Sequence, residues 1–196
     1  IVIYDSCYTT FALKLFLQGY YIGSGSMQPV LVNQGEESNT SFTDFIVVSA
    51  FEKNTLNFLS SGPGILLTDG TVSCSIPPLY DSVYLSITHR NSIQTWTANP
   101  VLLSNQFNYD FTTAALQAYG NNQIEVEPGI FAFYTGDINQ DGYIDGFDYP
   151  EFDTDSQNNV SGVYVATDLN GDGYVDGFDY PVFDQNSQSN VSLITP

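Results

Sequence analysis

The chain has 196 residues, of which 42% are hydrophobic and 15% aromatic, and its net charge at pH 7 is -19. This length and composition indicate a globular protein with one good core and room for a small second unit. The negative charge argues against binding to nucleic acid or to anionic membranes. No apolar run approaches the roughly 20 residues that a transmembrane helix requires.

The first four residues form a short apolar stretch, IVIY, ahead of a polar segment, DSCYTTF. Because an apolar strand with an unpaired edge invites pairing, we expect this stretch either to complete its own sheet or to add to the sheet of a neighbouring copy. Donation from copy to copy would build an open chain of subunits, that is, a filament. The residues of this predicted assembly strand are Ile1, Val2, Ile3 and Tyr4.

The chain has two cysteines, Cys7 and Cys74. A disulfide between them would close a long loop, stabilise the fold by roughly 4 kcal/mol and suit a secreted protein. Two unpaired buried thiols are the alternative. The chain opens at Ile1 without a basic leader segment, and we interpret it as the mature form of a secreted protein.

Alternation of apolar and polar residues predicts β-strands in the first two thirds of the chain. The clearest examples are SVYLSITH at 82–89 and ALKLFLQ at 12–18, in which Leu13, Leu15 and Leu17 alternate with Lys14, Phe16 and Gln18. Turn sequences such as SGPG, TDG and EPG separate further short strands, which we expect at 44–50, 65–67, 71–76, 93–96, 124–126 and 130–134. Only residues 111–119 have a weakly helical pattern. Short strands at this spacing favour an antiparallel β-sandwich.

Few residues of this region suggest catalysis. His89 is the only histidine and no nucleophile motif accompanies it, so a strand-end residue held by hydrogen bonds is the favoured interpretation. Glu125 and Glu127 share one side of a predicted strand, as a glycosidase pair would, but a solvated edge is the simpler reading. Trp96 and the many Tyr and Phe residues could form a sugar-stacking surface, although aromatic residues more often lie in the core. We predict that the protein is not an enzyme.

The segment DINQDGYIDGFDYP at 137–150 is repeated as DLNGDGYVDGFDYP at 168–181. In both copies oxygen-bearing side chains occupy positions 1, 3, 5, 9 and 12, and glycine occupies position 6. This is the ligand spacing of a calcium-binding loop, in which position 7 contributes its main-chain carbonyl. We therefore predict at least two calcium ions, held by Asp137, Asn139, Asp141, Tyr143, Asp145 and Asp148, and by Asp168, Asn170, Asp172, Tyr174, Asp176 and Asp179. The absence of His and Cys from both loops argues against zinc and copper.

Negative charge is concentrated at this end of the chain. From residue 137 onward there are twelve acidic residues and no Lys, Arg or His. Without metal these charges repel one another, so we expect metal binding and folding to be coupled here. Ile144 and Val175, at position 8 of the two loops, are expected to pair the loops through a short apolar contact.

Short helices are expected directly after the loops. Pro150 and Pro181 occupy positions where the first turn of a helix tolerates proline. We predict helices over PEFDTDSQ and PVFDQNSQ, with Phe152 and Phe183 packed inward.

The repeat resembles dockerin modules, whose duplicated calcium loops also end in Asp at position 12. The resemblance runs from residue 137 to roughly residue 192 and implies calcium ligation by both loops. Dockerins of the common type carry small hydroxyl residues at positions 10 and 11, and basic residues on the following helix, to engage a cohesin partner. Here those positions hold Gly146 and Phe147, and Gly177 and Phe178, and the segment has no Lys or Arg. Cohesin recognition is therefore not implied.

The wider chain is similar to the C-terminal region of many bacterial cell-surface and secreted proteins, in which a β-sandwich precedes a dockerin-like pair. The segments LKLFLQGYY, YLSITHRNSIQTW, AYGNN and FAFYTGDINQDGYIDG carry this resemblance. It implies an architecture and an extracellular, bacterial location rather than an activity.

Together these observations predict a mainly β protein. An antiparallel, Ig-like β-sandwich with an N-terminal strand extension occupies residues 1–135, and a dockerin-like calcium-binding domain with two short helices occupies residues 136–196. The main functional hypothesis is an extracellular calcium-binding structural protein that self-assembles into filaments by strand donation. The alternatives are a calcium-dependent docking or cell-surface anchoring module and a carbohydrate-binding sandwich. The expected partners are other copies of the chain, a surface protein or a polysaccharide, with no nucleic acid and no membrane insertion.

Overall fold

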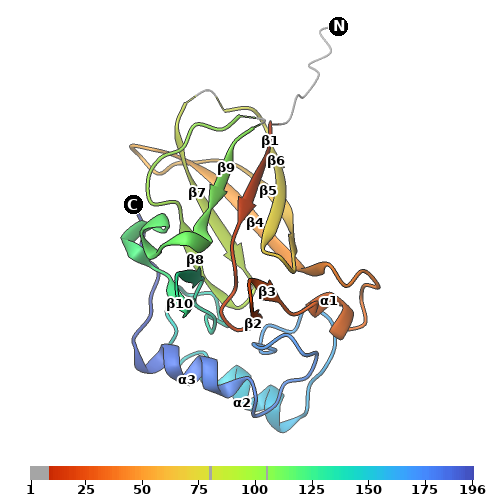
Figure 1. Ribbon diagram of the computed structural model, residues 1–196. Coiled ribbons are helices and arrows are strands. Elements are labelled where there is room, and N and C mark those ends of the chain that lie inside the picture. The colour runs from red at the N-terminus through yellow and green to blue at the C-terminus, as the bar shows by residue number, and fades with distance from the viewer. Residues whose placement is uncertain (1–8, 80, 105) are drawn as a thin grey trace, which may run out of the picture.

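A seven-stranded sheet dominates the computed structural model, which describes residues 9–79, 81–104 and 106–196 (Figure 1). Its strand order is β8 (Ser92–Trp96), β7 (Val83–His89), β4 (Phe42–Glu52), β5 (Phe58–Leu67), β6 (Thr71–Ile76), β1 (Thr9–Lys14) and β9 (Asn108–Asp110). Neighbouring strands are antiparallel, except that β1 and β9 are parallel. The prediction of a mainly β protein is confirmed, with a curled sheet consistent with a sandwich.

Every predicted strand overlaps an observed one, and the prediction for 71–76 matches β6. In β7, Val83, Leu85 and Ile87 are buried, as the alternation predicts. The prediction for 12–18 is wrong in one respect. The strand ends at Lys14 and Phe16 is buried together with its neighbours, because the chain leaves the sheet and its side chains no longer alternate between two faces.

The sequence SGPG lies inside β5 and is not a turn. A Cβ atom on Gly62 would collide with the carbonyl oxygen of Ser75, and one on Gly64 would lie 2.7 Å from Val72. Both glycines therefore permit the close approach of β6. Pro63 is opposite Val47 of β4 and lies just beyond the β5–β6 ladder, which covers residues 64–66, so it stands where β5 is paired on one side only.

Smaller elements cover the ends of the sheet. They include two hairpins, β2 (Tyr21–Gly23) with β3 (Ser26–Met27) and β10 (Ile124–Glu127) with β11 (Ile130–Ala132), and a single helical turn, α1 (Val30–Asn33). The weakly helical stretch at 111–119 forms three 3-10 turns, η1 (Phe111–Thr113), η2 (Ala115–Gln117) and η3 (Tyr119–Asn121).

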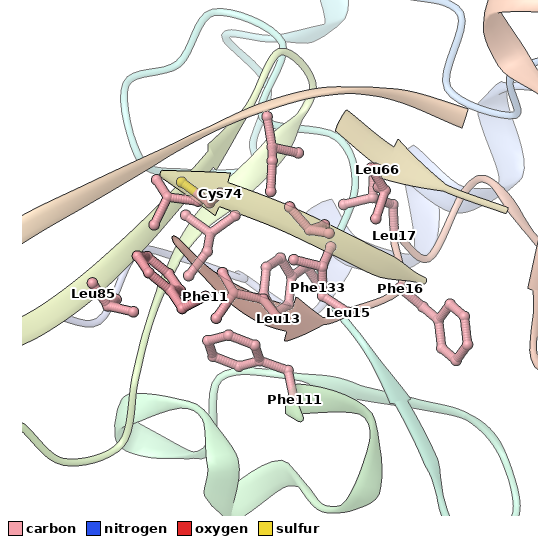
Figure 2. Packing of buried hydrophobic residues seen from close by; sticks show 14 of the residues in the cluster. Phe11, Leu13, Leu15, Phe16, Leu17, Leu66, Cys74, Leu85, Phe111 and Phe133 are labelled. Carbon is pink, nitrogen blue, oxygen red and sulfur yellow. The ribbon is translucent and has the colours of Figure 1, made fainter. Parts of the chain in front are cut away.

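The main apolar core joins strands from opposite parts of the sheet (Figure 2). Phe11 of β1 and Leu85 of β7 belong to the same buried cluster although three strands separate β1 from β7 in the sheet order. Phe111 and Phe133 close the cluster from outside the sheet, with ring centroids 5.1 Å apart in an edge-to-face arrangement. Burial of each such side chain contributes roughly 1.5–3 kcal/mol, so this cluster stabilises the curled sheet.

The C-terminal segment builds a second apolar cluster around two helices, α2 (Tyr149–Gln157) and α3 (Tyr180–Gln188). Figure 1 shows the two helices side by side at one end of the sheet. Phe152 and Phe183 are buried and stacked, with centroids 6.4 Å apart, which confirms that they pack inward. Ile93 of β8 belongs to this cluster, so the helices also pack against the β region. The division between residues 135 and 136 stays a prediction.

Two predicted features involve residues outside the described part of the chain. The assembly strand, Ile1 to Tyr4, lies there, and so does Cys7. Cys74 has no disulfide partner among the described residues; it lies in β6, buried in the main core, where burial raises the pKa of its thiol to about 11. The Cys7–Cys74 disulfide and strand donation both stay predictions.

Among the described residues, no helix is long and apolar enough to cross a membrane.

Phe111→Ala should destabilise the fold by roughly 3–5 kcal/mol, because it leaves a cavity against Phe133 and Tyr109. Leu116→Ala is the matched control. Its side chain is 65% exposed, and its loss should change the free energy of unfolding by no more than about 0.5 kcal/mol. Urea denaturation measures both values, and equal effects would contradict the assignment of Phe111 to the core.

Candidate metal-binding loops

Each loop is folded around the aspartate at position 12. In the first loop, Asp148 Oδ1 accepts hydrogen bonds from the main-chain N–H groups of Ile138 and Asn139 at 2.7 and 3.1 Å. Its Oδ2 accepts one from Asp145 at 2.9 Å. The second loop repeats all three bonds at 2.7, 2.9 and 2.9 Å, from Leu169, Asn170 and Asp176 to Asp179. The two sequence copies therefore adopt the same local conformation.

The side chains at positions 3 and 5 also accept hydrogen bonds from the loop main chain. Asn139 Oδ1 accepts from the N–H of Asp141 at 2.8 Å, and Asp141 Oδ1 accepts from the N–H of Tyr143 at 3.0 Å. The same two distances occur in the second loop, at Asn170, Asp172 and Tyr174. These short-range turns, which Asn and Asp favour, give each loop its tight curvature.

The aspartates at position 1 differ between the loops. Asp137 is 2% exposed, and its Oδ1 has no hydrogen-bond partner within the described residues. In Asp168, Oδ1 accepts from the N–H of Gly171 at 2.9 Å, and Oδ2 accepts from the N–H of Gly173 and from Gln34 Nε2 at 3.1 and 2.8 Å. A buried carboxylate oxygen without a partner is costly, so Asp137 is the less satisfied of the two.

Burial and mutual repulsion perturb these carboxylates. Burial, reinforced by the charge of Asp148, raises the pKa of Asp137 to about 7. Burial, opposed by main-chain hydrogen bonds and reinforced by the charge of Asp168, raises the pKa of Asp179 to about 7. Burial also raises the pKa of both Asp148 and Asp168. The raised pKa values mean that the charged form of these carboxylates is disfavoured, and residues 137–196 contain no cationic side chain to stabilise it.

The donor set fits a hard cation. Nowhere in the described chain are three or more His, Cys, Asp or Glu side chains grouped so that they could hold a metal ion. The loop oxygens instead accept hydrogen bonds from the loop's own main chain. Each loop nevertheless offers five oxygen-bearing side chains and no His or Cys ligand, and the buried Oδ1 of Asp137 has no hydrogen-bond partner within the described residues. Calcium ligation stays a prediction that this chemistry suits.

The position-8 residues do not pair with each other through the main chain. Ile144 N–H donates to Val191 O at 2.9 Å, and Val175 N–H donates to Val160 O at 2.8 Å. Each loop thus pairs with the segment that follows the helix of the other repeat. Both side chains are buried in the second apolar cluster, so the predicted apolar role is confirmed, and direct contact between the two side chains stays a prediction.

Each loop also presents an aromatic side chain to solvent. Phe147 and Phe178, at position 11, are 78% and 79% exposed and are the most exposed large hydrophobic residues of the described chain. Tyr149 and Tyr180 follow two residues later and pack with the stacked phenylalanines of α2 and α3. The two loops therefore carry equivalent exposed aromatic groups above a shared aromatic cluster.

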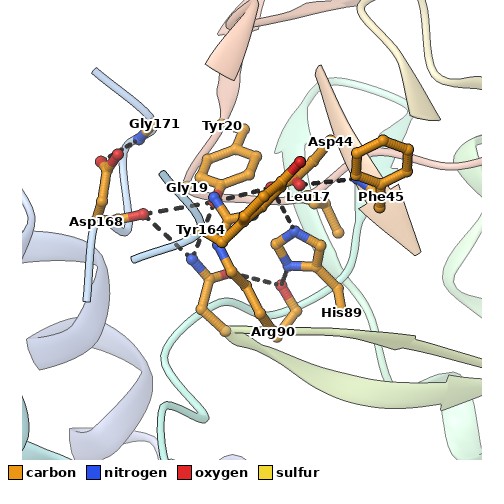
Figure 3. Close-up of polar contacts among 12 residues, drawn as sticks. Leu17, Gly19, Tyr20, Asp44, Phe45, His89, Arg90, Tyr164, Asp168 and Gly171 are labelled. Carbon is orange, nitrogen blue, oxygen red and sulfur yellow. Dashed lines mark hydrogen bonds and ion pairs between the residues drawn. The ribbon is translucent and has the colours of Figure 1, made fainter. Parts of the chain in front are cut away.

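A buried polar network joins the second repeat to the β region (Figure 3). Arg90, after β7, forms an ion pair with Asp44 and donates to Tyr20 OH at 2.9 Å and to Val165 O at 3.3 Å. Its guanidinium also lies 5.9 Å from the ring centres of Tyr20 and Tyr164. Although burial alone would raise it, the pKa of Asp44 is held below its usual value by the His89 and Arg90 contacts. This network fixes the chain just before the second loop.

His89 belongs to this network as a structural residue. Its Nε2 lies 3.1 Å from Asp44 Oδ2 and its Nδ1 lies 3.3 Å from Ser92 Oγ, which confirms a strand-end histidine held by hydrogen bonds. Burial lowers the pKa of His89. The sequence did not reveal that Asp44 and Gln34 take part in the contact between the second repeat and the β region. The only available signal was Arg90, one of three cationic residues in the chain.

The other side chains considered for catalysis or sugar binding have local roles. Glu125 accepts from Gly129 N–H at 2.7 Å, and Glu127 accepts from Tyr21 OH at 2.8 Å. Glu125 therefore supports its own hairpin, whereas Glu127 links that hairpin to β2. Trp96 is 5% exposed and lies 4.6 Å from Phe51 between ring centres, so the sugar-stacking role is wrong for this residue.

Comparison with family models and with curated proteins finds no match. Similar solved structures include one chain of the crystal structure of an N-terminal interface mutant of the type II cohesin-X-dockerin complex from Acetivibrio cellulolyticus. It matches with a TM-score of 0.51 and 16% identity over 94% of this chain and 97% of that chain. A C-terminal interface mutant of the complex matches with a TM-score of 0.50 and 15% identity over 91% and 95%. At this identity the likeness shows the fold alone.

Asp179→Asn should gain stability relative to the wild-type protein as the pH rises, when both are measured in chelator. The pKa of Asp179 in the fold, about 7, lies above that of an unfolded aspartate, about 3.9. Its stabilising contribution is therefore fully present below about pH 4 and is lost as the pH rises through about 7. Asparagine does not titrate. Urea midpoints of both proteins between about pH 5 and pH 8 test this expectation, and parallel pH profiles would contradict it.

Proposed function

We propose that this protein is an extracellular, calcium-dependent docking module, in which residues 136–196 form a dockerin-like calcium-binding domain. The observation that carries the proposal is the pair of exposed phenylalanines, Phe147 and Phe178, which two loops with calcium-ligand spacing hold at equivalent positions. An ordered loop is needed to present such side chains, and a bound cation is the natural means of ordering an acidic loop.

Three features support calcium as the ion. The loop side chains at positions 1, 3, 5, 9 and 12 are all oxygen donors, and position 6 is a glycine with positive φ in both loops, Gly142 at 88° and Gly173 at 94°. The buried Oδ1 of Asp137 lacks a partner within the described residues. A divalent ion would supply the positive charge that the segment itself does not contain, and all-oxygen loops of this length favour calcium over magnesium.

Two features support a protein partner. Exposed aromatic side chains are frequent anchors of protein interfaces, because they bury a large apolar area on binding. The structures that this chain resembles in fold are described as cohesin-X-dockerin complexes. We infer that the partner is a cohesin-type module with an apolar recess. Phe147 and Phe178 would enter this recess in place of the small hydroxyl residues of common dockerins.

The proposed location follows from the ion. Calcium-binding modules outside cells work at millimolar calcium, where weak loops are filled. A net charge of -19 also keeps the protein soluble at a bacterial surface and away from anionic lipid. The filament hypothesis depends on Ile1 to Tyr4, which lie outside the described residues. The carbohydrate alternative is weakened because Trp96 is buried and does not present its ring to a ligand. Docking is therefore the function that the described residues favour.

Chelator-stripped protein should take up two calcium ions per chain in a calorimetric titration. Asp137→Ala and Asp168→Ala should each lose one ion and keep the other, because each substitution removes the position-1 ligand of one loop. Asp81→Ala is the control, since Asp81 is an exposed partner of Lys53 and lies in neither loop. It should keep both ions. Absence of calcium uptake by the wild-type protein would refute the metal-binding proposal.

The double variant Phe147→Ala with Phe178→Ala should bind a cohesin-type partner roughly 30-fold or more weakly than the wild-type protein, at about 2 kcal/mol or more for the loss of an aromatic anchor. The probe is a panel of purified type II cohesin modules, measured by surface plasmon resonance in calcium and in chelator. Leu116→Ala is the control for an exposed apolar side chain outside the loops and should bind normally.

Light scattering of the wild-type protein separates docking from self-assembly. A docking module should remain monomeric both in millimolar calcium and in chelator. Growth of large particles in calcium, together with no binding to any cohesin, would overturn the docking proposal in favour of the filament hypothesis.

A further inference from the structure

The two loops share their ligand positions but differ in their surroundings. The second loop packs against α1 and the turn before β2, whereas no hydrogen bond between described residues joins the first loop to α1. The sequence difference that permits this lies at position 4, which is Gln140 in the first loop and Gly171 in the second. A Cβ atom on Gly171 would collide with Val30 and would lie 2.9 Å from the Tyr20 ring. The glycine therefore allows the β region to approach the second loop closely.

Gln34, which caps the end of α1, reaches directly into this contact. It is 8% exposed, and its Nε2 donates to Asp168 Oδ2 at 2.8 Å. Its Oε1 accepts from the N–H of Tyr164 at 3.0 Å. One end of the amide faces an acceptor and the other faces a donor, so both sets of contacts fix the same orientation of the side chain. Gln34 therefore holds the Asp168 carboxylate from outside the loop.

Neighbouring groups reinforce the same contact. Asn33 Nδ2 donates to Gly171 O at 2.8 Å, and Asn91 Nδ2 donates to Asp168 O at 3.2 Å. A Cβ atom on Gly173 would lie 2.7 Å from Asn33 O, so position 6 of the loop is also pressed against the end of α1. The β region thus fixes the side chain and the main-chain carbonyl of Asp168.

Among the described residues, no side chain from outside the first loop hydrogen-bonds the Asp137 carboxylate as Gln34 does that of Asp168. The side chain of Gln140 donates to the main-chain carbonyl of Asp137 at 2.5 Å and comes from within the loop. The Oδ1 atom of Asp137 has no partner within the described residues. Two loops with the same ligand types therefore differ at position 1. The Asp168 carboxylate is held by its own loop and by the β region, and Asp137 by its own loop within the described residues.

We propose that Gln34 is a positioning residue for the second loop, which holds the Asp168 carboxylate in place for a cation and couples occupancy of that loop to α1. The inference rests on the proposed calcium binding. Side chains that hydrogen-bond a metal ligand from outside the coordination sphere commonly change metal affinity by about 10- to 100-fold when they are removed. Because Gln34 belongs to the β region, the second loop should bind its ion more tightly than the first and transmit binding to residues 30–36.

Single-site parents make the test specific. Asp137→Ala leaves only the second loop and Asp168→Ala leaves only the first. Gln34→Met, which keeps the side-chain length but removes both amide groups, is added to each parent, and calcium affinity is measured by calorimetry. We expect Gln34→Met to weaken binding about 10- to 100-fold in the Asp137→Ala parent and to leave binding unchanged in the Asp168→Ala parent. Gln140→Met, added to the Asp137→Ala parent, is the matched control and should leave second-loop affinity unchanged.

Amide hydrogen exchange supplies a readout that does not depend on affinity. Calcium should increase the protection of residues 30–36 in the Asp137→Ala parent but not in the Asp168→Ala parent. Equal calcium affinity with and without Gln34→Met in the Asp137→Ala parent would overturn the proposal while leaving calcium binding intact. An equal loss in both parents would also overturn it, because it would indicate general destabilisation. Absence of calcium uptake in the wild-type protein and in both parents would refute calcium binding and this inference together.

Discussion

The C-terminal third of the structure depends on how buried carboxylates are kept together when no cationic side chain lies in the same segment. Main-chain N–H groups meet part of this requirement, since Asp148 and Asp179 each accept three such bonds. Neutral donors do not remove the net charge, and burial still raises the pKa of Asp137 and Asp179 to about 7. The same loops lead directly into α2 and α3, so whatever neutralises the loops also fixes the ends of these helices and the packing of Phe152 against Phe183.

Where the second repeat contacts the β region, a buried carboxylate is instead paired with a cationic side chain. There the negative charge of Asp44 is balanced by Arg90, and the guanidinium is kept between two tyrosine rings and a main-chain carbonyl. Breaking such a buried pair by removing one partner typically costs about 3–5 kcal/mol, because the other charge is left uncompensated. One of the chain's three cationic residues is therefore used where two parts of the structure meet. The ion pair thus lies where the segment before the second loop contacts the sheet, through Val165 and Tyr164.

Much of the fold could be predicted from local patterns. Alternation located the strands, because one face of each strand packs on a single core, and the prolines after the loops located the two helices. Residues whose roles depend on distant neighbours could not be predicted in the same way. SGPG has the composition of a turn, but its glycines lie in a strand because β6 packs closely on them. Alternation places Phe16 on the same face as Lys14, but Phe16 is buried because the chain leaves the sheet after Lys14. Gln34 carries no local signal at all, because its partner Asp168 lies 134 residues further along the chain.

The internal duplication separates what the fold requires from what it leaves open. Position 4 differs between the copies where the second loop meets the β region, and the glycine there has a steric reason. Position 11 is phenylalanine in both copies although each side chain is almost fully exposed and contributes little to either core. Exposed aromatic residues reduce solubility, so the fold alone gives no reason to carry one in each loop. A binding role for this face gives such a reason, and it requires both loops to be held in the conformation that presents the two rings.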